Sequence, residues 1–134
     1  MTIDKKLISK DAKIAVIGLG YVGLPIALAF ARKIKVIGFD INEKRVDMMR
    51  NKIDPSEELT AADFEGCDIE FTTSIDVLRQ ANFFIVAVPT PIDEHNLPDL
   101  KPLIGASKSL VVIAFLFFLV LLLRLIEIIT TLLF

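Results

Sequence analysis

The sequence has little of the chemistry that marks several common classes of protein. Its 134 residues include one cysteine, one histidine and no tryptophan. One cysteine cannot form an intramolecular disulfide or a cysteine-rich zinc site, and so low a count is typical of a reducing compartment. The 15 basic residues are balanced by 17 acidic ones, so the chain lacks the basic excess of proteins that bind nucleic acid. We expect no nucleic-acid partner.

The beginning of the chain carries no recognisable secretion signal. Lys5, Lys6 and Lys10 lie within the first ten residues, but no apolar core of signal-peptide length accompanies them. We therefore expect a cytoplasmic protein, with membrane association left open only for the end of the chain.

Apolar residues are unevenly distributed between two parts of the sequence. Residues 110–134 are apolar at all but four positions, which are Arg124, Glu127, Thr130 and Thr131. Without this segment the apolar fraction falls to roughly 47%, an ordinary value for a globular domain. We therefore predict a globular domain over residues 1–109 and an apolar, helical tail over residues 110–134.

The first half of the globular part alternates between strand-like and helix-like segments. Lys13–Ile17 and Lys35–Phe39 are short apolar runs rich in β-branched residues, typical of strands buried on both faces. A buried helix is expected over Tyr21–Ala31. A second, amphipathic helix follows the other strand, with Asn42 as its N-cap.

The second half continues the same alternation. Ile69–Thr73 is expected to be an edge-like strand, and Ser74 to cap a short helix. Phe83–Val88 is the most strand-like run, and a helix capped by Asp99 is expected to end near Ser109. These patterns predict an α/β fold with a Rossmann-like, doubly wound parallel sheet of about four strands.

Three glycines follow the first predicted strand with the spacing G-x-G-x-x-G. Gly18 is expected to make the tight turn, Gly20 to let the backbone approach a pyrophosphate, and Gly23 to let the helix lie close to the strand. The N–H groups at the start of the helix then face an anion. This context, between strand and helix, predicts a dinucleotide site.

Asp40 ends the second strand, 20 residues after Gly20. A carboxylate there accepts hydrogen bonds from the adenosine ribose and repels a 2′-phosphate, so NAD is favoured over NADP. Arg45 is either a neighbour of the ribose or a helix-surface arginine. Thr90, within Pro89–Pro91, is either a cofactor contact or part of a rigid loop.

No set of residues forms a recognisable reaction centre or metal site. Cys67 has no histidine near it in the sequence, and we interpret it as a structural thiol. His95, the only histidine, is interpreted as a surface residue, because one histidine with scattered carboxylates does not make a metal site. We therefore assign no catalytic residue.

Four motifs, taken together, resemble the UDP-glucose/GDP-mannose dehydrogenase family of nucleotide-sugar 6-dehydrogenases. They are Lys13–Pro25, Gly38–Arg45, Val88–Pro91 and Pro98–Leu100. The continuation of the glycine turn as Gly-Leu-Pro, and Asp-Ile-Asn after the second strand, look most like the branch that oxidises UDP-N-acetylhexosamines for bacterial polysaccharides.

The resemblance implies an NAD-dependent oxidoreductase that converts a sugar C6 alcohol to a carboxylate with two NAD. It implies that Tyr21 and Val22 line the pyrophosphate turn, that Asp40 and Arg45 hold the ribose region, and that Thr90 contacts the cofactor. The Glu-Ser-Thr segment, the lysine and asparagine, and the nucleophilic cysteine of the family have no counterpart in this chain. We therefore expect an inactive NAD-binding fragment.

The apolar tail has three alternative explanations. It is a membrane anchor, a partial replacement for a fifth strand, or the out-of-frame product of a disrupted gene, which is the origin that we favour. A surface so apolar is expected to associate with a membrane or with itself. The alternative to a dehydrogenase fragment is therefore a membrane-tethered NAD-sensing module.

Overall fold

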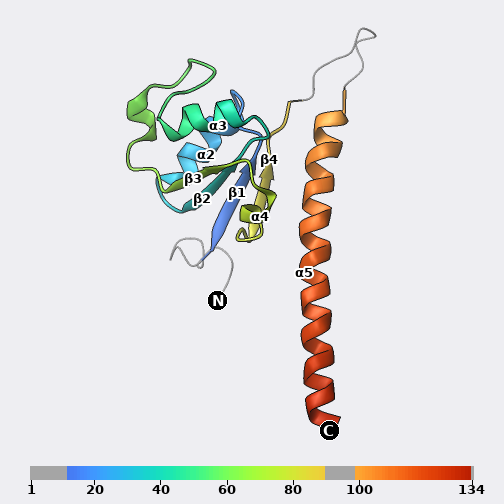
Figure 1. Cartoon of the computed structure of the whole chain (residues 1–134). Helices are drawn as coiled ribbons and strands as arrows, with labels where there is room; N and C mark the ends of the chain where they lie inside the picture. The colour runs from blue at the N-terminus through green and yellow to red at the C-terminus, as the bar shows by residue number, and fades with distance from the viewer. Residues whose placement is uncertain (1–11, 90–98, 134) are drawn as a thin grey trace.

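The computed structural model describes residues 12–89 and 99–133, which form a parallel α/β domain followed by a long helix (Figure 1). The sheet has four strands in the order β3-β2-β1-β4, and every pairing is parallel. The strands are β1 (Lys13–Ile17), β2 (Lys35–Phe39), β3 (Ile69–Thr72) and β4 (Phe83–Val86). The predicted Rossmann-like fold is confirmed, with β3 at an edge as expected.

Side chains of β1 alternate between two hydrophobic clusters, one on each face of the sheet. Ile14 and Val16 belong to the first cluster, whereas Ala15 and Ile17 belong to the second. A strand in this position must be apolar at nearly every residue. This explains why the run in the sequence showed no alternation.

Two helices supply the first cluster and two supply the second. Helices α2 (Gly23–Ala31) and α3 (Glu43–Arg50) pack on the first face. Helices α4 (Ile75–Leu78) and α5 (Lys101–Leu133) contribute to the second. The chain therefore crosses from one face to the other after β3, as it does in a doubly wound sheet.

The starts of α2, α3 and α4 follow the sequence expectations with two corrections. Asn42 caps α3, because its side chain accepts a hydrogen bond from the Arg45 N–H. Helix α2 begins at Gly23, not at Tyr21, because the glycine turn takes up the two preceding residues. Ser74 precedes α4 but its side chain makes no capping hydrogen bond, and the Thr72 hydroxyl instead accepts from the Ser74 N–H at 3.0 Å.

The loop before β3 contains one short 3-10 helix, η1 (Ala61–Phe64). Thr60 and Asp63 form a capping box at its start, in which the Asp63 carboxylate accepts from the Thr60 N–H at 2.8 Å. Phe64 is buried and its ring lies 6.2 Å from that of Phe71 in β3. These contacts fasten the loop to the edge of the sheet.

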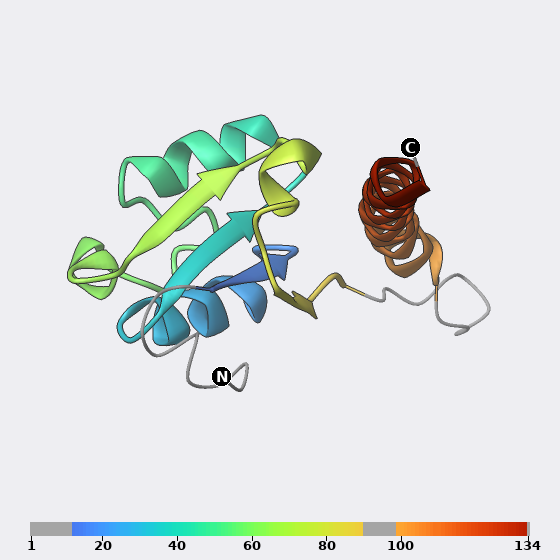
Figure 2. The same cartoon turned by 90° about the horizontal axis from the view of Figure 1, so that it is seen from below.

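Helix α5 runs without a break across the predicted boundary between residues 109 and 110, so the helix end predicted near Ser109 is wrong. No glycine or proline follows Gly105 to stop the helix. The Asp99 carboxylate accepts from the Lys101 N–H at 2.9 Å, but the first helical hydrogen bond is accepted by the Leu100 carbonyl oxygen, so Asp99 precedes the N-cap position. Ala106 and Ile113, on either side of that boundary, both pack in the second cluster. Both views place α5 beside β4 and α4, and its C-terminal half extends past the sheet (Figures 1 and 2). The division into two parts at residue 109 stays a prediction.

Within the part of the chain that the structure describes, no helix is both long enough and apolar enough to cross a bilayer.

Candidate cofactor-binding site

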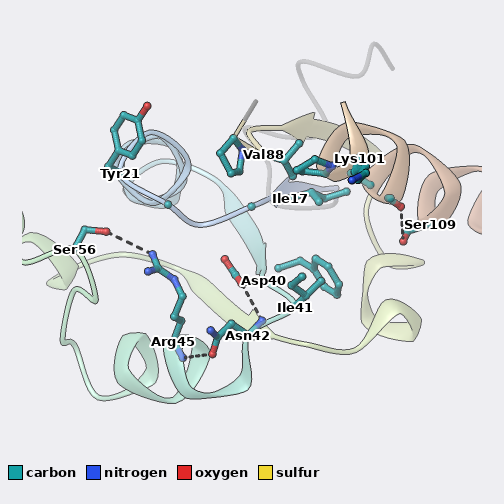
Figure 3. Close-up of a pocket in the computed structure, with 17 residues that line it drawn as sticks. Ile17, Tyr21, Asp40, Ile41, Asn42, Arg45, Ser56, Val88, Lys101 and Ser109 are labelled. Atoms are coloured by element: carbon teal, nitrogen blue, oxygen red, sulfur yellow. Dashed lines mark hydrogen bonds between the residues drawn. The ribbon is translucent and has the colours of Figure 1, made fainter. Parts of the chain in front are cut away.

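A cavity of about 710 Å³ opens between the carboxyl ends of β1 and β4. This is the switch point of the sheet, because β2 and β3 lie on one side of β1 and β4 lies on the other. Its walls come from the glycine turn, the end of β2, the loop after β4 and the first turns of α5 (Figure 3). Ligands of doubly wound folds bind at this switch point. The fold therefore brings together segments that are far apart in the sequence.

Gly18 and Gly23 are required by the packing of the protein itself. Gly18 has a φ of +89°, and a Cβ there would lie 2.9 Å from the Ala87 carbonyl oxygen. A Cβ on Gly23 would collide with the carbonyl oxygen of Gly18. The close approach of α2 to the end of β1 is possible only with glycine at both positions.

Gly20 is different, because the protein gives no internal reason for a glycine there. Its φ is not in the left-handed region, and a Cβ would have no atom within 4 Å. The residue lines the cavity. A side chain at Gly20 would therefore fill space on the cavity side, which is the space that the pyrophosphate of a dinucleotide needs.

The Asp40 carboxylate is fixed at the end of β2 by two backbone donors. Its Oδ2 accepts from the Leu19 N–H at 3.0 Å, and its Oδ1 accepts from the Asn42 N–H at 2.9 Å. Each carboxylate oxygen has more than one acceptor site. The group is thus oriented before any ligand arrives, and it keeps capacity to accept from ribose hydroxyls.

Arg45 connects the glycine turn to a neighbouring loop across the cavity wall. Its Nη2 donates to the Leu19 carbonyl oxygen at 3.1 Å and to the Ser56 hydroxyl at 3.5 Å. In Figure 3 the side chain extends from α3 toward Ser56, past Asp40. Arg45 is therefore a lining residue of the cavity, in contact with the turn, instead of a solvated helix-surface arginine.

Ser56, in the loop after α3, lines the cavity, which the sequence did not indicate. Asp54 is 5% exposed, and its carboxylate accepts from the backbone N–H groups of Ser56, Glu58 and Leu59 at 2.8 to 3.0 Å. An aspartate that accepts from N–H groups two or more residues later is a local turn signal. Asp54-Pro55-Ser56 was a signal for a turn, but nothing local indicated that the turn would meet Arg45.

The remaining predicted cofactor residues have different places. Tyr21 lines the cavity and is 67% exposed. Val22 is the N-cap residue of α2 and half exposed, but it is not among the lining residues. Thr90 lies outside the described residues, although Val88 and Pro89 just before it line the cavity. His95 also lies outside the described residues.

Cys67 lies in the loop before β3, at the sheet edge opposite to the cavity. Its Sγ donates to the Leu28 carbonyl oxygen at 3.5 Å, and the side chain packs against the first cluster. These contacts support the interpretation as a structural thiol. In the described ranges, no three His, Cys, Asp or Glu residues lie close enough to hold a metal ion.

Comparison with known proteins finds a matching family model and similar proteins. Residues 12–114 match the model of the "UDP-glucose/GDP-mannose dehydrogenase family, NAD binding domain". Protein CapL of Staphylococcus aureus is 53% identical over 99 residues, which are 74% of this chain and 23% of CapL. UDP-N-acetyl-D-glucosamine 6-dehydrogenase of Pseudomonas aeruginosa is 52% identical over 102 residues, 75% of this chain and 24% of the relative.

Solved structures agree with the sequence relatives. UDP-N-acetyl-mannosamine dehydrogenase Cap5O from S. aureus matches with a TM-score of 0.68 and 29% identity, over 76% of this chain and 26% of Cap5O. UDP-D-ManNAc dehydrogenase from Pyrococcus horikoshii matches with a TM-score of 0.66 and 31% identity, over 72% of this chain and 24% of the other. The chain thus spans about a quarter of the length of these relatives.

Proposed function

The chain belongs to the UDP-glucose/GDP-mannose dehydrogenase family and corresponds to its NAD-binding domain, and we propose that the cavity at the switch point binds NAD. The cofactor, when bound, accepts a hydride from the substrate. The observation that carries the proposal is Gly20, a glycine that the protein's own packing does not require, on the wall of a cavity at the start of α2.

The glycine turn takes the pyrophosphate in this proposal. Gly18 and Gly23 hold the turn against the end of β4, and Gly20 leaves its surface open. Backbone N–H groups at the N-terminus of a helix favour an anion at that position. Tyr21 and Val22 flank the pyrophosphate from the exposed side of the turn.

Asp40 and Arg45 take the adenosine ribose. The Asp40 carboxylate, fixed by Leu19 and Asn42, accepts from the ribose hydroxyls and disfavours a 2′-phosphate. Arg45 holds the wall beside it through Leu19 and Ser56. Thr90, which follows Val88 and Pro89 in the sequence, is proposed as a further cofactor contact.

The reaction of the whole protein is the oxidation of the C6 alcohol of a UDP-N-acetylhexosamine to a carboxylate. The balance requires two hydrides, each taken up by one NAD, and one water that supplies the second carboxylate oxygen, with three protons released. The relatives named UDP-N-acetyl-D-glucosamine 6-dehydrogenase and UDP-N-acetyl-D-mannosamine dehydrogenase favour this substrate class. This chain by itself binds NAD without turning over the sugar.

The proposed location is the cytoplasm. The proposed partner of residues 110–134 is a membrane or a further copy of the chain. The described residues and the relatives lend no support to a membrane-tethered sensing module.

Isothermal titration calorimetry of the folded chain with NAD⁺ tests the proposal, with Gly20→Val as the critical variant. We expect one NAD⁺ per chain, and an affinity at least about tenfold lower in the variant, because the valine occupies the pyrophosphate space. The unfolding midpoint should not change, since a Cβ at Gly20 meets no atom. Equal binding by both proteins would refute the assignment of the turn.

A further inference from the structure

Helix α5 has two apolar sides with different surroundings. Ala106 and Ile113 are each 8% exposed and pack against the second face of the sheet. Val111 and Phe115 are 66% and 63% exposed. At about 100° per residue, these two lie on the side of the helix opposite to Ala106 and Ile113. The helix covers the sheet with one side and leaves the other uncovered.

The uncovered side has a regular spacing, and we call it the outer seam. Its positions are separated alternately by four and three residues, and they are Ile104, Lys108, Val111, Phe115, Phe118 and Leu122. This spacing is the a and d pattern of a coiled coil. Within the sequence the same spacing continues at Leu125, Ile129 and Leu132, where the backbone is still helical.

The exposed area of the outer seam is large enough for an interface. Its five apolar side chains are 42% to 66% exposed. At about 150–250 Å² for a large side chain, they expose on the order of 500 Å². Two such faces would bury roughly 1,000 Å², the size at which specific interfaces begin. A patch of this size matches the largest apolar patch of a typical monomer, and such patches are often functional.

We propose that the outer seam pairs with the outer seam of a second copy of this chain, as a two-helix coiled coil. The second copy fits because it brings the same alternation of four and three residues, so its knobs meet matching holes. Lys108 is the one charged residue among the described side chains of the seam. The seam therefore carries no pattern of charges that would select a different, oppositely charged partner.

This pairing is compatible with cofactor binding and is independent of it. The residues of α5 that line the cavity are Lys101, Pro102, Gly105, Ala106 and Ser109. None of them belongs to the outer seam. A dimer formed through the seam leaves the cavity of each copy accessible, and its loss would not affect the proposal that the chain binds NAD.

Sedimentation velocity of the full chain in detergent-free buffer tests the proposal. We expect a dimer in the wild type and a monomer in the Phe115→Asp/Phe118→Asp variant, with the dissociation constant raised by about 100-fold or more. The matched control is Leu123→Asp, because Leu123 is 57% exposed on the same helix but lies off the seam. The control should remain a dimer.

Two further measurements keep the test decisive. Far-UV circular dichroism checks that the variants keep their helix, and Phe115→Gln/Phe118→Gln replaces the charged variant should it fail to fold. A monomeric wild type, an unlimited aggregate in place of a dimer, or equal dissociation of the Leu123→Asp control would overturn the proposal. Flotation of the wild type with phosphatidylcholine–phosphatidylglycerol vesicles, without a dimer in their absence, would also overturn it and assign the seam to a lipid surface.

Discussion

Leucines of the sheet domain and leucines of the long helix have opposite surroundings. Leu24 and Leu78 are 1% and 0% exposed, whereas Leu121 and Leu123 are 59% and 57% exposed. The exposed fractions differ although the residue type is the same, because only the leucines of the sheet domain are covered by other helices or strands. Helices on both faces of the sheet cover the side chains of β1 and β2 after the first residue of each strand. The C-terminal half of α5, in contrast, runs past the sheet (Figure 1).

The largest expected contrast in stability is between leucines from the two regions. Leu24→Ala removes a buried side chain from the first cluster and should reduce the free energy of unfolding by about 3 kcal/mol. Leu121→Ala removes an exposed one and should change it by less than about 0.5 kcal/mol. Urea unfolding, followed by circular dichroism at a concentration where the chain is monomeric, measures both. Similar losses would mean that the helix is packed in solution.

Glycine-to-alanine substitutions in the two regions should change the free energy of unfolding in opposite directions. Gly23→Ala forces a Cβ against the Gly18 carbonyl oxygen, and we expect a loss of about 2 kcal/mol. In Gly105→Ala, in α5, the added Cβ meets no atom within 4 Å. The free energy of unfolding should rise by up to about 1 kcal/mol, because alanine has the higher helix propensity. The same urea experiment applies. A tolerated Gly23→Ala would show that the turn is looser than the contacts indicate.

Asp40→Asn should weaken NAD⁺ binding and reduce the discrimination against NADP⁺. Asparagine has one carbonyl oxygen in place of two carboxylate oxygens, so one of the contacts with Leu19 and Asn42 is lost. We expect roughly tenfold weaker NAD⁺ binding and a smaller preference for NAD⁺ over NADP⁺ in calorimetry. Asp76→Asn, at an exposed carboxylate paired with Arg79, is the control and should bind NAD⁺ normally. An unchanged preference in Asp40→Asn would remove Asp40 from the site.

The smallest expected effect is a pH dependence located in the sheet domain. Hydrogen bonds from the Thr60 backbone and hydroxyl, helped by Arg32, lower the pKa of Asp63 below its ordinary value of 3.8. A carboxyl with a lower pKa in the folded state stabilises the protein above its unfolded pKa, and this contribution is lost as the pH falls through the folded pKa. Below pH 4, the free energy of unfolding should therefore fall less steeply with decreasing pH in Asp63→Asn than in the wild type. Urea unfolding at a series of pH values measures this slope. An unchanged slope would contradict this role of the capping box.

Much of the fold and part of the site could be predicted because the signals were local. The glycine spacing and the strand that ends at Asp40 are contained in about 30 residues, the size of one βαβ unit. Asn42 indicated the start of α3, because asparagine is a preferred N-cap residue. These features need no knowledge of what lies across the sheet.

The features that were missed depend on distant partners. The Asp54 loop contacts Arg45 through Ser56, a contact that the local turn signal cannot indicate. The position of Ile113 under the sheet is another example, because periodicity in a uniformly apolar run cannot show which side is covered.

The most direct test compares the full chain with a chain that ends at residue 114, the end of the family match. This cut keeps Ala106 and Ile113 on the sheet and removes most of the exposed helix. Titration calorimetry should give the same affinity for NAD⁺ in both, because the cofactor site and the exposed helix are separate regions. An unfolded short chain, or one that has lost NAD⁺ binding, would contradict the account.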